Sequence, residues 1–186
     1  MNTHTQVFKA AAEGPLKDSK ALVACTGEEW TVKEYYDDSA RAAKSFIHLG
    51  VGRFESVSIL GVNSPEWLMS NNGAILAGGF AAGIYTTNEA PACEYIIAHS
   101  SARVVVVDGQ KQLDKILSIR SRLPKLTAIV MYRDEKFSDP AGAKDPSLAK
   151  VYTWADFMKL GDAVSDKDLK ARMDAQKPGH CCTLIY

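Results

Sequence analysis

One stretch of the sequence, residues 55–87, limits the possible folds more strongly than any other. The run Val-Ser-Ile-Leu at residues 57–60 is typical of a buried strand, and an Asn-Ser-Pro-Glu helix start follows it. We expect a helix over residues 65–77, ended by the glycine pair 78–79, and then a second strand over residues 83–87. This is one βαβ unit, and its right-handed crossover makes the two strands parallel.

The remainder of the chain continues the alternation of strands and helices. Four consecutive valines at residues 104–107 indicate a strand that is covered on both faces, as in a parallel sheet with helices on each side. We therefore predict an α/β fold with a doubly wound, mostly parallel sheet and five strands after Arg53. The other strands expected there are residues 128–132 and 181–186, and the helices are residues 88–100, residues 110–123 and two short helices capped by Thr153 and Ser165.

The part before Arg53 is expected to be more irregular. A polar N-terminal segment, residues 1–20, contains a short helix at residues 7–12. A hairpin of residues 21–25 with residues 28–30 leads to a long helix that starts at Thr31, forms a capping box with Glu34 and stops at Gly50. Late in the chain, residues 133–150 are charged and lack periodicity, which predicts a mobile surface loop.

Composition excludes several classes of function. Lysine plus arginine equals aspartate plus glutamate at 22 each, so no net attraction to nucleic acid is encoded. The longest uncharged apolar stretch, residues 73–85, is shorter than the ~20 residues a membrane helix needs, so no transmembrane span is expected. The N-terminus lacks the pattern of a signal peptide, and the four cysteines have no metal-ligand spacing. We expect a cytoplasmic protein with packed cysteines and no metal site.

Ligands of open α/β sheets bind beyond the carboxyl ends of the strands, so the loop at residues 60–66 is the first place to look. It has one glycine where a dinucleotide fingerprint needs three, and Glu66 would repel a phosphate at the helix N-terminus. Packing is the preferred role for Trp67 and for the glycines that follow. The histidines are scattered, and Ser64 and Ser70 have no base nearby in the sequence, so no catalytic residue is assigned.

Several motifs together resemble one family. They are Gly50-Val51-Gly52, Asn63-Ser64-Pro65-Glu66-Trp67, Gly83-Ile84-Tyr85-Thr86-Thr87, Ala92-Cys93-Glu94-Tyr95-Ile96 and Val107-Asp108-Gly109-Gln110-Lys111-Gln112-Leu113. Over residues 20–186 the sequence resembles the N-terminal third of the acyl-adenylate-forming enzymes, and within them the bubblegum-type long-chain acyl-CoA synthetases. The resemblance implies that residues 21–186 are an incomplete AMP-dependent synthetase/ligase N-terminal α/β domain. Its last residues are similar to the strand that precedes the family's phosphate loop.

The resemblance also implies a function for the full-length enzyme. A fatty acid carboxylate attacks the α-phosphate of ATP with the help of Mg²⁺, and pyrophosphate leaves. The coenzyme A thiol then displaces AMP to give the thioester. Of the family's working parts, only Tyr186, at the entrance to the ATP phosphate loop, can be carried over to this sequence. We therefore expect a truncated or partial ligase that is inactive alone and needs no cofactor by itself. Peripheral association with the endoplasmic reticulum membrane is a further expectation.

Two other classes stay open at this stage. The first is a stand-alone, non-enzymatic α/β module that binds a protein partner, and the second is a dinucleotide-dependent oxidoreductase. The second shares the predicted sheet but lacks the glycine fingerprint. An apolar strand at residues 181–186, exposed at a sheet edge, would separate the first from the ligase hypothesis, because a stand-alone domain is expected to protect such an edge.

Overall fold

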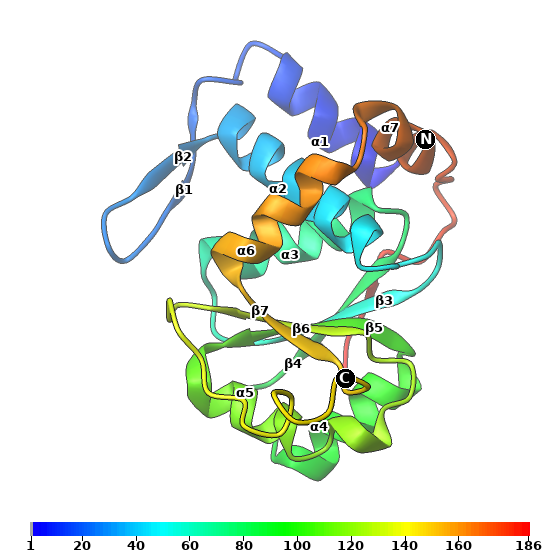
Figure 1. Cartoon of the computed structure of the whole chain (residues 1–186). Helices are drawn as coiled ribbons and strands as arrows, with labels where there is room; N and C mark the ends of the chain where they lie inside the picture. The colour runs from blue at the N-terminus through cyan, green and yellow to red at the C-terminus, as the bar shows by residue number, and fades with distance from the viewer. Residues whose placement is uncertain (1) are drawn as a thin grey trace.

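The computed structural model describes residues 2–186, and its centre is a six-stranded sheet. The strand order is β7-β6-β5-β3-β4-β8, and every neighbouring pair is parallel. The strands are β3 (Ser56–Leu60), β4 (Phe80–Ile84), β5 (Ala102–Asp108), β6 (Ala128–Tyr132), β7 (Lys150–Thr153) and β8 (Thr183–Leu184). A small antiparallel hairpin of β1 (Lys20–Val23) and β2 (Glu29–Thr31) stands apart from it (Figure 1). The predicted α/β class is confirmed.

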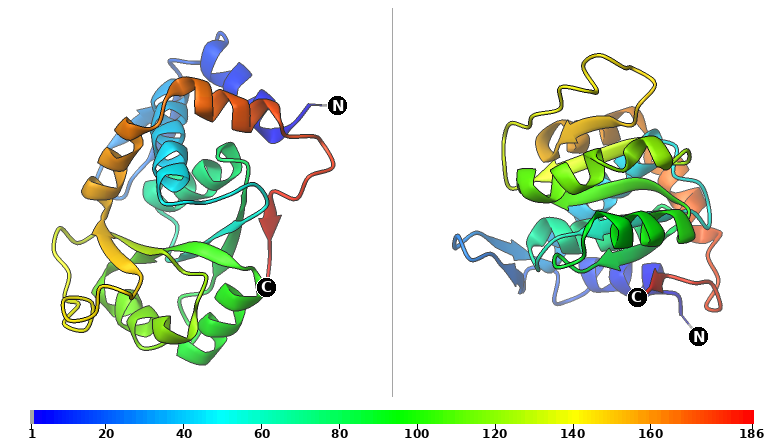
Figure 2. Two further views of the ribbon diagram at one scale, coloured as in Figure 1. Left: turned by 45° about the vertical axis from the view of Figure 1, so that its right-hand side comes forward. Right: turned by 90° about the horizontal axis from the view of Figure 1, so that it is seen from below.

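Helices cover both faces of the large sheet, as a doubly wound fold requires (Figures 1 and 2). One face carries the helices of residues 4–76 and 154–174, and the other carries the two helices that precede and follow β5 in the sequence. The first layer consists of α1 (His4–Glu13), α2 (Val32–His48), α3 (Pro65–Leu76), α6 (Trp154–Leu160) and α7 (Asp166–Asp174). The second consists of α4 (Ala90–His99) and α5 (Gly109–Leu117). Short 3₁₀ turns, η1 (Arg120–Arg122) and η2 (Gly161–Ala163), follow α5 and α6.

Each layer has its own hydrophobic core, and β5 contributes to both. Val104 and Val106 pack with Phe46 and Phe157 under the first layer. Val105 and Val107 pack on the other side, among the residues of α4 and α5. All four valines are fully buried, which confirms that this strand is covered on both faces.

Local signals set the helix boundaries. Thr31 and Glu34 form the predicted capping box, and Ser64 caps α3 by accepting a hydrogen bond from the Trp67 amide. Thr153 and Ser165 cap α6 and α7 in the same way. Gly78 has φ +86°, the left-handed conformation that closes α3.

Some predicted boundaries were wrong. β4 starts at Phe80 rather than residue 83, because the chain enters the sheet directly after the glycine pair that ends α3. β7 was not predicted, and the chain therefore has six strands rather than five after Arg53. The predicted helix over residues 110–123 stops at Leu117 and continues as a 3₁₀ turn. The predicted last strand shrinks to Thr183–Leu184.

The loop between β6 and β7 is exposed, yet it is anchored to the second layer. Arg120 donates two hydrogen bonds of 2.7 Å to the carboxylate of Asp139, and both side chains are almost fully buried. Burial raises the pKa of Asp139, but the bonds from Arg120 and the Gly142 amide outweigh it and hold that pKa below its usual value. The loop is thus tied to the domain at its middle.

The cysteines differ from the expectation in part. Cys93 is buried and packed, but Cys25, Cys181 and Cys182 are exposed, because they lie in a hairpin turn and in the segment that leads to a two-residue edge strand. All four are free thiols. Within residues 2–186, no helix combines the length and the apolar character needed to cross a bilayer.

Candidate functional site

A cleft of about 530 Å³ lies across the carboxyl ends of β3, β4 and β8, and we call it the edge cleft. Successive strands lie on opposite sides of β3, with β4 on one side and β5 on the other, so this end of the sheet is where an open α/β fold binds its ligands. The lining residues come from the ends of β4 and β8, from the segments that follow β3, β4 and β8, and from the start of α3: Gly61, Val62, Asn63, Trp67, Gly83, Ile84, Tyr85, Thr86, Thr183, Leu184, Ile185 and Tyr186.

None of the residues that line the edge cleft is charged. Trp67 provides an indole that also packs against the first core, and Tyr85 and Ile185 are 67 % and 87 % exposed. Large exposed apolar side chains that gather at a hollow mark a binding surface more often than scattered ones do. A ligand with an apolar, uncharged part therefore suits this cleft better than a phosphate does.

Side chains at the ends of two other strands hold the loop that follows β3. The Val62 amide donates to the Asp108 carboxylate at 3.3 Å, and the Tyr132 hydroxyl donates to the Val62 carbonyl at 3.3 Å. Asp108 ends β5 and Tyr132 ends β6, so both polar groups of one peptide residue are held by buried side chains. This loop is one wall of the edge cleft.

We call Asp108 and Tyr132 the braces of this loop, and two further features support them. Arg133 has φ +80° and is bound to Asp108 through Nε and through an Nη2 bond of 2.8 Å. A Cβ at Gly61 would overlap the Tyr132 hydroxyl and lie 2.9 Å from the Cβ of Asp108, so only glycine fits above this pair. Burial is the main reason that the pKa of Tyr132 is raised, with a smaller contribution from Asp108. The phenol therefore stays protonated and can donate its hydrogen bond.

The loop after β4 is held by a single lysine. The Lys115 ammonium group, on α5, donates to the carbonyls of Thr86 and Asn88 at 2.9 Å each. Thr86 lines the edge cleft. A charged donor on two main-chain carbonyls fixes that backbone more firmly than neutral bonds would.

The third wall contains Tyr186, the residue that the resemblance placed at the entrance to the phosphate loop. Its hydroxyl lies 2.9 Å from His99 Nδ1, and His99 stacks on Tyr95. Burial and the neighbouring Tyr95 raise the pKa of Tyr186. The structure thus brings Tyr186 into the same cleft as the loop at residues 60–66, while its role toward ATP stays a prediction.

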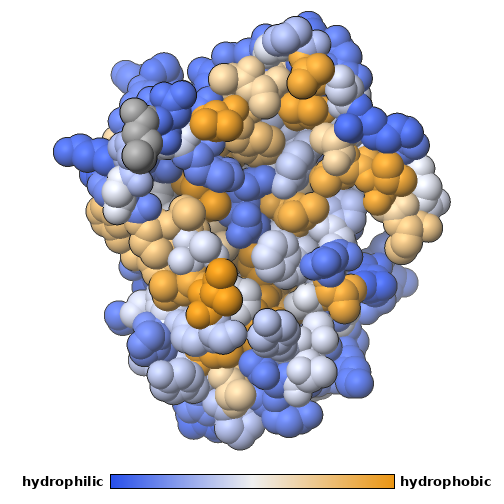
Figure 3. Space-filling model, turned by 180° about the vertical axis from the view of Figure 1, so that it is seen from behind, coloured by the Kyte–Doolittle hydropathy of each residue, from blue (hydrophilic) through white to orange (hydrophobic). Residues whose placement is uncertain are grey.

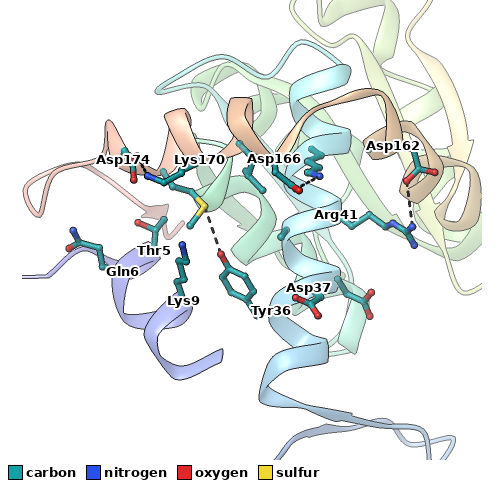
Figure 4. Close-up of a pocket in the computed structure, with 16 residues that line it drawn as sticks. Thr5, Gln6, Lys9, Tyr36, Asp37, Arg41, Asp162, Asp166, Lys170 and Asp174 are labelled. Atoms are coloured by element: carbon teal, nitrogen blue, oxygen red, sulfur yellow. Dashed lines mark hydrogen bonds and ion pairs between the residues drawn. The ribbon is translucent and has the colours of Figure 1, made fainter. Parts of the chain in front are cut away.

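A second hollow, of about 620 Å³, lies between α1, α2, η2 and α7, and we call it the helical hollow (Figure 4). Its rim carries Lys9, Asp37, Arg41, Asp162 and Lys170, with Tyr36 between them. Ion pairs between rim side chains satisfy much of this charge. They join Arg41 to Asp162 at 3.4 Å, Lys44 to Asp166 at 2.6 Å and Lys170 to Asp174.

In the view from behind, apolar side chains reach the surface in separate patches between hydrophilic ones (Figure 3). In the described residues 2–186, no group of three histidine, cysteine, aspartate or glutamate side chains is placed to hold a metal ion. We therefore assign a magnesium ion to none of the described residues.

From the sequence, a packing role was preferred for the loop at residues 60–66, and Tyr186 was named only by resemblance; the residues that brace the edge cleft were missed. Asp108, Lys115, Tyr132 and Arg133 received no role from their spacing. One signal was present: Asp108 and Arg133 are charged residues at the carboxyl ends of two apolar strands, the place where open α/β sheets bind ligands. Trp67 packs against the first core and also lines the edge cleft.

The fold and the cleft define a class: a doubly wound α/β domain with a ligand cleft at the carboxyl edge of its parallel strands. Residues 8–186 match the family model of the AMP-binding enzymes. The chain belongs to this family.

Two groups of relatives were found among characterised sequences. The chain is 47 % identical over 172 residues to the long-chain-fatty-acid–CoA ligase ACSBG2 of Xenopus laevis, a match that covers 91 % of this chain and 22 % of the relative. It is 45 % identical over 159 residues to human ACSBG1, with 86 % and 21 % covered. The chain therefore spans about a fifth of the length of these relatives.

Solved structures agree with the fold. The anthranilate CoA ligase AuaEII, bound to anthranoyl-AMP, has a TM-score of 0.65 and 30 % identity, with 70 % of this chain and 25 % of that chain covered. The N-terminal domain of FACL13 from Mycobacterium tuberculosis has a TM-score of 0.66 and 20 % identity, with 89 % and 37 % covered. At that identity the second similarity supports the fold alone.

Proposed function

We propose that this chain is a part of a long-chain fatty acid–CoA ligase, and that its edge cleft receives the apolar chain of the fatty acid. The observation that carries the proposal is the uncharged cleft at the carboxyl edge of the sheet, in a chain that is 47 % identical to a long-chain ligase. The chemistry of this ligase class uses ATP and coenzyme A, and both are substrates of the proposed enzyme. In the proposed reaction the fatty acid carboxylate attacks the α-phosphate of ATP and pyrophosphate leaves, so that the carboxylate is activated as an acyl-adenylate; the coenzyme A thiol then displaces AMP.

The residues of this chain have a limited share in that reaction. They orient an acyl chain, because the cleft walls carry no charged side chain and are fixed by hydrogen bonds that the main chain makes with Asp108, Tyr132 and Lys115. The phosphates are assigned to none of them, since the cleft offers no positive charge. We propose that the 186-residue chain binds fatty acid but does not catalyse the transfer alone.

Two measurements on the purified chain test this proposal. Displacement of a dansyl-labelled fatty acid by palmitate should show binding, and acetate at the same concentration should not compete. Fatty acid-dependent exchange between ATP and pyrophosphate should be absent. Exchange above background would contradict the claim of inactivity, and failure to bind either the labelled acid or palmitate would contradict the role of the cleft.

The alternative class, a module that binds a protein partner, is not favoured by the structure. β8 pairs with β4 through only two residues and is an edge strand, beside Ile185 with 87 % of its surface exposed. A stand-alone module is expected to protect such an edge. Hydrogen exchange over residues 181–186 discriminates: strong protection in a monomer would favour the module, and rapid exchange would favour the ligase part.

The location of the enzyme is also a proposal. We propose a cytoplasmic protein that associates peripherally with the endoplasmic reticulum membrane, on the support of the family resemblance and of a substrate that partitions into lipid. Cell fractionation with a salt wash tests it. Recovery in the soluble fraction before any wash would contradict the membrane association.

A further inference from the structure

The edge cleft contains two glycines, and the structure gives them different reasons to be glycine. At Gly61 a side chain is excluded, because a Cβ would overlap the Tyr132 hydroxyl. At Gly83 a side chain has room: the one heavy atom within 4 Å of an added Cβ is Cζ2 of Trp67, at an ordinary contact distance of 3.6 Å. Packing does not require a glycine at residue 83.

The backbone does not require it either. Gly83 lies in the regular part of β4, opposite Ile59 of β3, and its φ lies outside the left-handed region that favours glycine. Glycine inside a strand costs stability, because it loses more conformational freedom on folding than other residues and packs no side chain. Because neither packing nor the backbone requires glycine at residue 83, its presence there needs another explanation.

The reason lies in where Gly83 faces. Side chains alternate along a strand, so Gly83 shares a face with Ala81, which packs in the first core, rather than with Ile84, which packs in the second. Trp67, on α3, is on the same side of the sheet and is the nearest neighbour across the space. The missing side chain therefore leaves the edge cleft open between β4 and the Trp67 indole.

We propose that Gly83, together with the Trp67 indole, determines the length of the acyl chain that the edge cleft accepts. This inference rests on the proposed function, because it takes the ligand to be a fatty acid. The end of an apolar chain fits the space, which has no charged lining residue. Carbon atoms placed on residue 83 occupy the volume that the last methylenes of a long chain would fill, so they exclude long chains and leave short ones unaffected.

The test compares Gly83→Ala and Gly83→Val with the unsubstituted 186-residue chain. The control is Gly179→Val, which adds the same atoms at a site where nothing lies within 4 Å of a Cβ. Fatty acids of 10, 12, 14 and 16 carbons displace a dansyl-labelled fatty acid, and circular dichroism confirms folding of each variant. Gly83→Ala, the smaller change, carries the test if Gly83→Val does not fold.

The expected result is a change in length preference rather than a uniform loss. Gly83→Val should weaken binding of the longest acid roughly tenfold and that of the shortest less than about twofold, in line with the discrimination an apolar pocket achieves per methylene. Gly83→Ala should weaken binding of the longest acid by a smaller factor, and Gly179→Val should bind all four acids as the unsubstituted chain does. If both Gly83 variants keep the original length profile, the inference is wrong. If the unsubstituted chain binds no fatty acid, the proposed function fails and the inference fails with it.

Discussion

The edge cleft is smaller than the helical hollow, about 530 Å³ against about 620 Å³, and the two are built differently. The loops of the edge cleft are held by main-chain hydrogen bonds to Asp108, Lys115 and Tyr132, side chains that are buried or half-buried. Ion pairs among more exposed side chains line the helical hollow, such as Arg41 with Asp162. Hydrogen bonds to buried side chains fix the shape of a loop, whereas exposed ion pairs contribute little to stability. Volume alone favours the helical hollow, whereas the more firmly held walls favour the edge cleft that we propose as the binding site.

The largest effect is expected at Tyr132, whose side chain supports the loop after β3 and is 2 % exposed. Tyr132→Ala should lower the free energy of unfolding by about 3–5 kcal/mol, the usual loss for a large aromatic in a core. Urea unfolding followed by circular dichroism measures it. The control is Tyr132→Phe, which keeps the ring and removes the bond to the Val62 carbonyl, with an expected loss of about 0.5–1.5 kcal/mol. Equal losses in the two variants would show that the hydroxyl, rather than the ring, dominates.

Lys115 comes next, because it holds the second wall of the edge cleft. Lys115→Met keeps the length of the side chain and removes the two bonds to the carbonyls of Thr86 and Asn88. A loss of about 1.5–3 kcal/mol in the free energy of unfolding is expected, as for hydrogen bonds from a charged group. Hydrogen exchange should also become faster at residues 85–88. An unchanged exchange rate there would mean that the loop holds its shape without the lysine.

The sequence predicted the local elements of the fold but not these hydrogen bonds between distant residues. The valine strand, β6 and the capping box of Thr31 with Glu34 follow from signals carried within a few neighbouring residues, and they were predicted correctly. The bonds from Val62 to Asp108 and Tyr132 join residues 46 and 70 positions apart, and they form only because β5 and β6 lie on one side of β3. Strand order decides such pairs, and periodicity does not encode it.

The errors have a similar cause. β7 has four residues, starts with an exposed lysine and lies at the sheet edge, so its sequence looks like the end of the preceding loop. β4 contains Ala81, Ala82 and Gly83, which lack the β-branched pattern of a strand, and it was placed too late. Its neighbours in the sheet, β3 and β8, impose the strand there.

A third prediction contrasts the two glycines of the edge cleft. Gly61→Ala should destabilise the chain by about 1–3 kcal/mol, because the new methyl group collides with the Tyr132 hydroxyl. Gly83→Ala should act in the opposite direction and stabilise by about 0.4–1 kcal/mol, since the position has room and an ordinary strand backbone. Thermal and urea unfolding of the two variants side by side give the signs. Destabilisation by both would mean that Gly83, too, is required by packing.

The smallest effect is expected in the helical hollow, where Lys44 donates to Asp166 at 2.6 Å. That hydrogen bond is the main reason that the pKa of Asp166 lies below its usual value. A lowered folded-state pKa contributes stability that is present above the unfolded pKa of about 3.9 and is lost as the pH falls through the folded pKa. Asp166→Asn should therefore lower the thermal midpoint slightly at pH 7 and leave it unchanged near pH 2. The carboxylate is fully exposed, so the change in thermal midpoint at pH 7 should be smaller than that of any variant at Tyr132 or Lys115. The control is Lys44→Met, which breaks the same ion pair. A loss at pH 7 as large as that of Lys115→Met would mean that the two hollows are held equally firmly, and the contrast between them would no longer identify the binding site.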